Sequence, residues 1–341
     1  MKGRGASSNP KNRFERLEVT LDPGEQTRPQ TEYLVDDSQS IITRNSSPDI
    51  SFTASLNPYR GCEHGCSYCY ARPYHEYLGF SAGLDFESKI LAKPRAAELL
   101  RKELSSPKWK PECLAMSGVT DCYQPVERKL GITRDCLRVL ADFCNPVAVV
   151  TKNHLVTRDI DLLSILATQE ATGVYLSITT LDASLAAKLE PRASSPRHRL
   201  DAIRQLSEAG IPTGVLVAPV IPGLNEHEIP AILKASREAG ATQAGMTLLR
   251  LPFGVKDIFL GWLETHYPEA FARVEGRIRE IRGGNLNDFR FGSRMKGEGV
   301  LAEQIEQLFQ VASNREGFGG KSFPLSTKAF RNPQGQQLEL L

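Results

Sequence analysis

Short apolar runs alternate with helical patterns along most of this chain, and this alternation restricts its fold more than any other feature. The apolar runs that are candidate strands are Cys113–Ser117, Val147–Thr151, Val174–Ile178, Thr213–Val220 and Ala244–Leu249. Two of the helices between them end at Gly210 and Gly240, and a strand follows each glycine directly. Glycine commonly ends a helix because it adopts the left-handed conformation without strain. Repeated strand–helix units predict a parallel sheet joined by right-handed crossovers.

A further candidate strand, Ala54–Leu56, leads into a loop rich in cysteine and brings the number of strand–helix units to six. This pattern alone fits either a doubly wound sheet or a barrel. In both architectures the ligand site lies at the C-terminal ends of the strands. The residues that follow each candidate strand are therefore the candidates for binding and catalysis.

The cysteine loop holds Cys62, Cys66 and Cys69 in the spacing C-x3-C-x2-C. Three thiolates are one short of the four that complete an ordinary four-iron cluster or a structural zinc site. A loop with three cysteines can therefore leave one iron of a cluster open to a ligand that is not protein. The open position indicates an enzyme more than a structural site.

Other uses of the cysteines fit the sequence less well. A disulfide framework is disfavoured because the chain has only 7 cysteines in 341 residues and shows no secretory signal peptide. A zinc site would need a fourth ligand, for which His64 or His75 is available, but zinc fingers usually pair their cysteines as C-x2-C. An electron-transfer iron–sulfur protein would need four protein ligands, and only three are in register.

The loop resembles that of the radical S-adenosylmethionine (radical SAM) superfamily, in which C-x3-C-x-aromatic-C binds a [4Fe–4S] cluster; Tyr68 occupies the aromatic position. The resemblance implies an α/β fold, a partial (β/α)6 TIM-type barrel with irregular N- and C-terminal extensions. It also implies that SAM chelates the open iron through its amino and carboxylate groups. One electron from the cluster then releases a 5′-deoxyadenosyl radical, and a reductant such as flavodoxin or ferredoxin supplies that electron.

Within the superfamily, residues from about 50 to 255 resemble the spore photoproduct lyase-like (DNA repair photolyase-like) branch, in an uncharacterised bacterial subfamily. The segment Ser117–Glu127 stands in the place of the Gly-Gly-Glu motif that holds the cofactor's amino group. The residues that the resemblance assigns to the cofactor are Tyr68, Ser117, Gly118, Thr120, Asp121, Lys152, Ser177 and Pro222. Among them, Lys152 and Ser177 match the residues that contact the cofactor carboxylate. The turn that contains Pro222 would present its backbone to the adenine ring.

Two residues are candidates for catalysis, Tyr70 and Cys122. Tyr70 flanks the last cluster cysteine, as a tyrosine does in the lyases. The lyases also use a cysteine as hydrogen donor to the product radical, but Ser117 and Gly118 stand at that place in this chain. Cys122, in the same segment, could substitute for the thiol or could be an ordinary buried cysteine. The remaining cysteines are expected in the core: Cys113, Cys136 and Cys144.

Positive charge is concentrated locally, since the net charge of the chain is only +2. The segment Arg192–Arg199 holds three arginines and no acid, and Arg273–Lys296 holds seven basic residues against three acids. Arg199 could reach the cofactor or an anionic substrate. DNA or RNA is therefore a candidate partner through phosphate contacts, although a solvated basic face explains the same pattern. Two alternatives to an enzyme remain: a nucleic-acid-binding protein whose metal is only structural, and an electron-transfer iron–sulfur protein.

The composition divides the chain into three parts. Residues 1–49 are predicted to be a basic, partly disordered N-terminal extension, 50–285 the core domain, and 286–341 a C-terminal helix followed by a tail. The helix that follows the strand Val147–Thr151 is expected to begin at Thr157 as its N-cap. No apolar run approaches the ~18 residues of a membrane helix. We therefore expect a cytoplasmic protein without a membrane partner.

Overall fold

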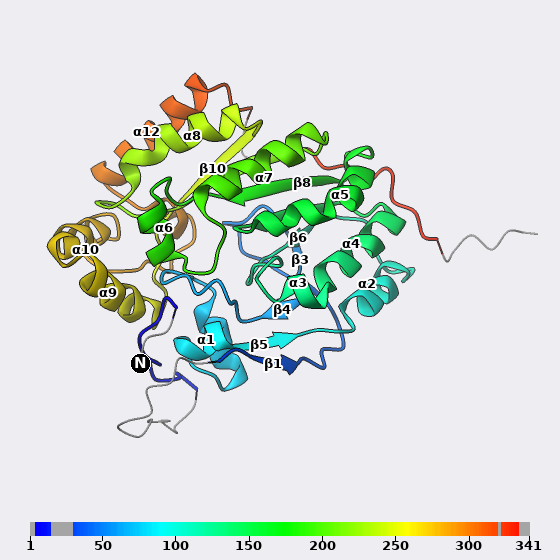
Figure 1. The fold of residues 1–341 in the computed structure, drawn as a ribbon, viewed down its shortest axis with the longest axis horizontal. Coiled ribbons are helices and arrows are strands. Elements are labelled where there is room, and N and C mark those ends of the chain that lie inside the picture. Colours follow the sequence, from blue (N-terminus) through cyan, green and yellow to red (C-terminus); the bar gives the residue numbers. More distant parts are fainter. Residues whose placement is uncertain (1–3, 15–29, 320–321, 334–341) are drawn as a thin grey trace, which may run out of the picture.

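The computed structural model describes residues 4–14, 30–319 and 322–333, and its centre is a seven-stranded sheet (Figure 1). The parallel strands of this sheet are β3 (Ala54–Leu56), β6 (Leu114–Met116), β7 (Val147–Thr151), β8 (Thr172–Ser177), β9 (Thr213–Val220) and β10 (Gln243–Leu248). They follow one another in chain order, and β2 (Ile42–Arg44) lies antiparallel beside β3. A doubly wound sheet would reverse its strand order at a switch point. The unreversed order confirms the partial-barrel prediction.

Helices cover the outer face of this sheet (Figure 1). They are α2 (Ala96–Leu104), α4 (Ile132–Phe143), α5 (Ile160–Ala167), α7 (Pro196–Glu208), α8 (Ile229–Glu238) and α12 (Val300–Arg315). On α4, the buried side chains Ile132, Cys136 and Leu140 recur every four residues, so they lie on one face of the helix. That face belongs to the main hydrophobic core, together with the buried residues of the strands.

The start of α5 differs from the sequence prediction. A 3-10 helix, η2 (His154–Asp159), precedes α5, and Asn153 caps it by accepting a hydrogen bond from Leu155 N. Thr157 lies inside this turn and donates to His154 O at 3.0 Å. The prediction of Thr157 as the N-cap is therefore wrong, because the polar cap lies four residues earlier.

A second hydrophobic cluster connects the cysteine loop to the helices that follow β8 and β10. Its helical elements are α6 (Ala183–Leu189), α9 (Val255–His266) and α10 (Phe271–Glu280). Cys66 and Tyr68 of the cysteine loop belong to this cluster, with Phe259 and Trp262 of α9. The remaining helices are short: η1 (Arg72–Leu78), α1 (Leu84–Ser88), α3 (Glu127–Leu130), η3 (Glu226–Glu228), η4 (Pro268–Ala270) and α11 (Ser293–Lys296). The cluster therefore supports the loop from the side away from the main core.

The described part of the N-terminal extension packs against the cysteine loop. A small sheet joins β1 (Glu32–Val35) to β5 (Lys89–Ala92) and β5 to β4 (Tyr59–Arg60), and the cysteine loop follows β4. Residues 4–14 lie against this region, and a Cβ on Gly5 would come within 1.8 Å of Gly65 O. Residues 4–14 are thus part of the folded domain and not a solvated tail. Residues 1–3 and 15–29 also belong to the extension that was predicted to be partly disordered, and they lie outside the described residues.

The C-terminal helix α12 packs against α8. Within the described residues, no helix combines the length and the apolar character needed to span a bilayer.

Candidate functional site

The cysteine loop is held in shape by a buried arginine. Arg72 is 0% exposed, donates hydrogen bonds to Cys66 O (3.0 Å) and Gly83 O (2.8 Å), and pairs with Glu87 at 2.8 Å. From the N-terminal segment, Gly5 N donates to the same Glu87 carboxylate at 3.2 Å. The three cysteines of the loop are free thiols, two buried and one partly exposed. They are therefore presented by a backbone that is fixed from two sides.

The donor set fits an iron–sulfur cluster better than a zinc ion. Within the described part of the chain, no three His, Cys, Asp or Glu side chains are arranged to hold one metal ion. In a cubane cluster each thiolate binds a different iron, so three cysteines need not converge on one point. The two histidines considered as zinc ligands have other partners: His64 Nδ1 lies 3.4 Å from Asp121, and His75 packs against Phe80 and Phe86.

His64 joins the cysteine loop to the neighbouring strand ends. Burial opposes its charged form, but the Asp121 carboxylate and Cys62 raise the pKa of His64 to about 10. Its second nitrogen, Nε2, lies 3.3 Å from Asn153 Nδ2, just beyond β7. His64 therefore holds the loop in register with the sheet.

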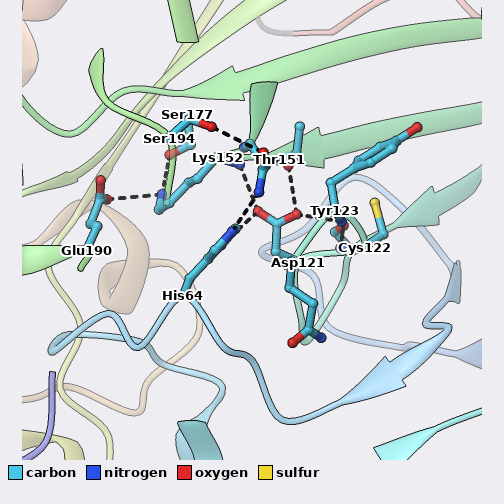
Figure 2. Close-up of polar contacts among 12 residues, drawn as sticks. His64, Asp121, Cys122, Tyr123, Thr151, Lys152, Ser177, Glu190 and Ser194 are labelled. Carbon is cyan, nitrogen blue, oxygen red and sulfur yellow. Dashed lines mark hydrogen bonds and ion pairs between the residues drawn. The ribbon is translucent and has the colours of Figure 1, made fainter. Parts of the chain in front are cut away.

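Asp121 was predicted to bind the cofactor, and the structure places its carboxylate among four protein groups (Figure 2). It accepts hydrogen bonds from Thr151 Oγ1 (2.7 Å), Lys152 N (2.7 Å) and Tyr123 N (2.9 Å), and it faces His64. A carboxylate offers about four acceptor positions. Asp121 therefore organises the ends of β6 and β7 around the cysteine loop.

Lys152 and Ser177, the pair assigned to the cofactor carboxylate, lie together at the ends of β7 and β8 (Figure 2). Lys152 Nζ donates to Ser177 Oγ at 2.6 Å and to Ala218 O of β9 at 3.3 Å. The nearest carboxylate oxygen, on Glu190, is 3.6 Å away. An ammonium group has three donors, so one N–H of Lys152 is left without a short hydrogen bond.

Glu190 is the centre of a buried polar network that the sequence did not predict. Its carboxylate accepts hydrogen bonds from Arg199, from Tyr68 OH and from Thr179 Oγ1. Burial opposes its ionisation, but Arg199 and then Lys152 lower the pKa of Glu190 to about 2. Its only signal in the sequence is an acid directly after a helix, because its partners lie on other segments of the fold, from 9 to 122 residues away.

Arg199 was predicted to reach the cofactor or an anionic substrate, and the structure places its side chain in the buried network around Glu190. Its side chain is 1% exposed and donates to Glu190, to Ser177 O at 2.9 Å and to Ser194 O at 2.7 Å. Arg199 is therefore a positioning residue, which fixes Glu190 beneath Lys152.

The segment after β6 forms a tight polar turn at the mouth of the barrel. Ser117 has a positive φ of 86°, and its Oγ accepts a hydrogen bond from Cys122 N at 2.9 Å. The Thr120 hydroxyl is buried and donates to Tyr59 O at 3.3 Å. Gly118 O accepts a hydrogen bond from Tyr70 OH at 3.0 Å, and Tyr70 is half-exposed. The predicted residues of this segment are thus brought together beside Tyr70.

Cys122 was expected to be either a substitute hydrogen donor or an ordinary buried cysteine, and its position favours the second. The side chain is 0% exposed and belongs to the main hydrophobic core. Figure 2 shows its sulfur on the opposite side of Asp121 from Lys152. The reason is local, because the bond to Ser117 Oγ turns the backbone so that the thiol faces inward.

Pro222 lies in the turn after β9, where it is buried. Asn225 fixes this turn: its Oδ1 accepts from Ile221 N at 2.6 Å, and its Nδ2 donates to Thr179 O (2.7 Å) and Pro219 O (3.1 Å). The turn is therefore tied to the end of β8, where Ser177 lies.

The basic segments are largely neutralised by acids, which weakens their interpretation as a phosphate-binding surface. Arg192 pairs with Glu63 at 2.7 Å, and Arg290 pairs with Asp288 at 3.0 Å. Further arginines with acidic partners are Arg277, Arg279 and Arg294. A cation whose charge is matched by a neighbouring carboxylate contributes little to long-range attraction of phosphate.

Comparisons with known proteins agree with this geometry. A family model described as "Radical SAM superfamily" matches residues 56–235. An uncharacterized protein of Mycobacterium tuberculosis is 34% identical over 232 residues, which cover 67% of this chain and 68% of that protein. An uncharacterized protein of Methanocaldococcus jannaschii is 31% identical over 225 residues, covering 65% and 79% of the two chains.

Among solved structures, a spore photoproduct lyase complexed with dinucleoside spore photoproduct has a similar fold. The TM-score is 0.62 at 16% sequence identity, and the match covers 89% of this chain and 86% of that one. At this identity the similarity concerns the fold, including the partial barrel.

Proposed function

Because the chain belongs to the radical SAM superfamily, we propose that Cys62, Cys66 and Cys69 hold its [4Fe–4S] cluster and that SAM binds beside it at the ends of β6–β9. Membership of the family implies both cofactors. When bound together, they supply a 5′-deoxyadenosyl radical that removes a hydrogen atom from a substrate.

The observation that carries this proposal is the contact between Lys152 and Ser177 next to the cysteine loop. The N–H of Lys152 without a short hydrogen bond can donate to the carboxylate of SAM, and the Ser177 hydroxyl lies beside it. Glu190 holds the ammonium group from behind at 3.6 Å. Because Arg199 already neutralises much of the charge of Glu190, Lys152 keeps positive charge for a ligand.

The chain's other groups arrange the site and exclude water. Since the Asp121 carboxylate has four protein partners, we assign it to positioning, and we assign the cofactor's amino group to the turn of Ser117 and Gly118. Tyr68 and the second hydrophobic cluster cover the site on the side of α9. Positioning of the reactive group and exclusion of water are the usual contributions of a protein to cofactor chemistry.

We further propose that the substrate is a nucleic acid or a nucleotide-like anion. The similarity of the fold to that of a lyase complexed with a dinucleoside photoproduct supports this proposal. The lyase-type thiol is replaced by Ser117–Gly118, and Cys122 faces the core. We therefore expect no efficient reversal of a thymine photoproduct.

The ligand set can be tested by Mössbauer spectroscopy of the reconstituted protein, with and without SAM. Three protein thiolates leave one iron unlike the other three, so addition of SAM should change the signal of one iron site in four. A spectrum with four equivalent sites that does not respond to SAM would contradict the proposal.

A further inference from the structure

Arg250 is a cation at the barrel mouth without a carboxylate partner among the described residues. Its contacts are Met295 Sδ, at 3.2 Å from Nη1, and the ring of Tyr70, at 5.7 Å. Its Nε is buried and has no hydrogen-bond partner. A buried donor without a partner is costly, so it indicates a group that a ligand completes.

The backbone holds Arg250 firmly at this place. It follows β10, between Leu249 and Leu251, which are both buried in the second hydrophobic cluster. Leu249 N donates to Val220 O at 2.9 Å, and Leu251 N donates to Asn287 Oδ1 at 3.1 Å. The backbone that carries the Arg250 side chain is therefore fixed by packing and hydrogen bonds, and it does not belong to a loose surface loop.

Neighbouring charges leave Arg250 unneutralised. Burial and then Arg294 lower the pKa of Arg250. Asp49 acts in the opposite direction, but its two oxygens are taken by Gly292 N and by Arg294. Arg282, also buried, has an Nε without a partner and donates only to backbone oxygens, at 2.6 Å and 3.2 Å. An anion at this position would relieve the excess of positive charge.

A belt of exposed aromatic rings extends from Arg250 over the adjoining surface. The rings, each between 42% and 67% exposed, are Tyr70, Tyr74, Tyr77, Phe14, Phe253 and Phe289. Adjacent members contact one another: the Tyr74 and Tyr77 centroids are 6.5 Å apart, those of Tyr77 and Phe14 4.9 Å, and those of Phe253 and Phe289 5.1 Å.

Arg13 joins the two halves of this belt. Its guanidinium carbon lies 5.0 Å from the centre of the Phe14 ring and 3.7 Å from that of Phe253. The segment that carries Arg13 runs between the start of α1 and the start of α9, as close approaches of Pro10 to Gly83 and Gly254 require (Figure 1). Exposed rings interleaved with arginine, beside an unneutralised guanidinium, are the pattern that binds single-stranded nucleic acid.

We propose that Arg250 binds a phosphate of a single-stranded nucleic acid and that the aromatic belt stacks on the neighbouring bases. This inference deepens the proposed function, on which it rests, and names the substrate class. A small anion would use Arg250 without the belt. A duplex would keep its bases stacked on one another and would not use the rings.

The test is fluorescence anisotropy of a labelled single-stranded DNA 12-mer with the anaerobically reconstituted protein. Arg250→Gln should weaken binding by about tenfold and reduce the slope of log Kd against log salt by about 0.7, as expected for one lost phosphate contact. The matched control is Arg279→Gln, which removes the same charge from the exposed face of α10, where Arg279 pairs with Glu275. The control should bind like the wild type, and the iron content of each variant verifies its folding.

A second variant separates stacking from charge. Tyr77→Ala should weaken binding at least about fivefold, but it should have no effect on binding of an abasic 12-mer, whereas Arg250→Gln should weaken both. Equal binding by Arg250→Gln and Arg279→Gln would overturn the inference, as would no binding by the wild type at ~50 mM salt. Formation of 5′-deoxyadenosine without DNA is measured in parallel. If the protein forms 5′-deoxyadenosine but does not bind DNA, this inference alone is refuted. If it binds DNA but forms no 5′-deoxyadenosine, the proposed function is refuted.

Discussion

Lys152 Nζ lies 2.6 Å from Ser177 Oγ, although Lys152 follows β7 and Ser177 is the last residue of β8. Their contact follows from the parallel sheet, in which the ends of β7 and β8 meet at one edge. The buried pair of Glu190 and Arg199 lies directly behind them. Lys152 and Ser177 can thus bind a carboxylate, and Glu190 and Arg199 behind them determine the charge of the site.

Replacing the three loop cysteines tests the cluster ligands. In the triple variant Cys62→Ala, Cys66→Ala, Cys69→Ala, iron and sulfide per chain should fall to near zero, because the variant lacks all three thiolates that are proposed to bind the cluster. The matched controls Cys113→Ala and Cys144→Ala should retain the metal content of the wild type. A full cluster in the triple variant would contradict the assignment.

Lys152→Ala should weaken SAM binding roughly tenfold to a hundredfold, since a hydrogen bond to a charged group contributes about 1.5–3 kcal/mol. Equilibrium binding to the reconstituted protein measures the effect, and iron content should remain unchanged. The exposed Lys234→Ala serves as control. An unaltered dissociation constant for Lys152→Ala would refute its role.

Arg199→Met should lower the free energy of unfolding by about 3 kcal/mol, because it removes the main partner of the buried Glu190 carboxylate. Adding Glu190→Gln to this variant should restore part of the loss. The exposed pair of Arg95 and Glu98 gives the control, Arg95→Met, which should leave the stability nearly unchanged. Urea unfolding measures all three. If Arg199→Met lost SAM affinity at full stability, Arg199 would contact the cofactor after all.

His75 should make stability depend on pH. Burial lowers the pKa of His75 to about 4 from its ordinary 6.5. Between these values the unfolded state binds more protons, so the stabilisation is complete above pH 6.5 and decreases as pH falls toward 4, by up to about 3 kcal/mol. The groups that act on this imidazole are Asp85, Lys89 and Arg72. In His75→Phe, the unfolding free energy should fall less steeply over this range, and an unchanged slope would refute the prediction.

Cys122→Ala should leave the yield of 5′-deoxyadenosine per cluster unchanged, because the thiol is in the core. It should cost stability by about 1 kcal/mol through lost packing. A chromatographic assay on equal amounts of cluster-loaded protein measures the yield. Loss of the product without loss of the cluster would restore Cys122 as a catalytic residue.

The sequence predicted the features that depend on local pattern and on general rules of parallel sheets. The strands from Val147 to Leu249 lie near their predicted positions, and Lys152 meets Ser177 because strand ends share an edge. The side chains that face one another in the buried network could not be predicted, even where they are only nine residues apart. The segment Arg192–Arg199 contains no acid, so Arg199 was expected to be a free cation. In the fold it faces Glu190, which lies on a different turn.

The sequence also did not predict the direction in which side chains point. Cys122 stands in a polar segment, and only the turn around Ser117 sends its thiol into the core. The aromatic belt could not be predicted either, because its rings come from four separate segments, including the N-terminal one that was predicted to be a tail.

We expect this chain to cleave SAM reductively, and the amount of 5′-deoxyadenosine formed measures this cleavage directly. The protein is reconstituted without oxygen, reduced with dithionite, incubated with SAM and analysed by chromatography. The wild type should form 5′-deoxyadenosine, Lys152→Ala should give a reduced yield at limiting SAM, and the triple cysteine variant should form none. A wild-type protein that carries a full cluster and binds SAM, but forms no more 5′-deoxyadenosine than the triple variant, would contradict this expectation.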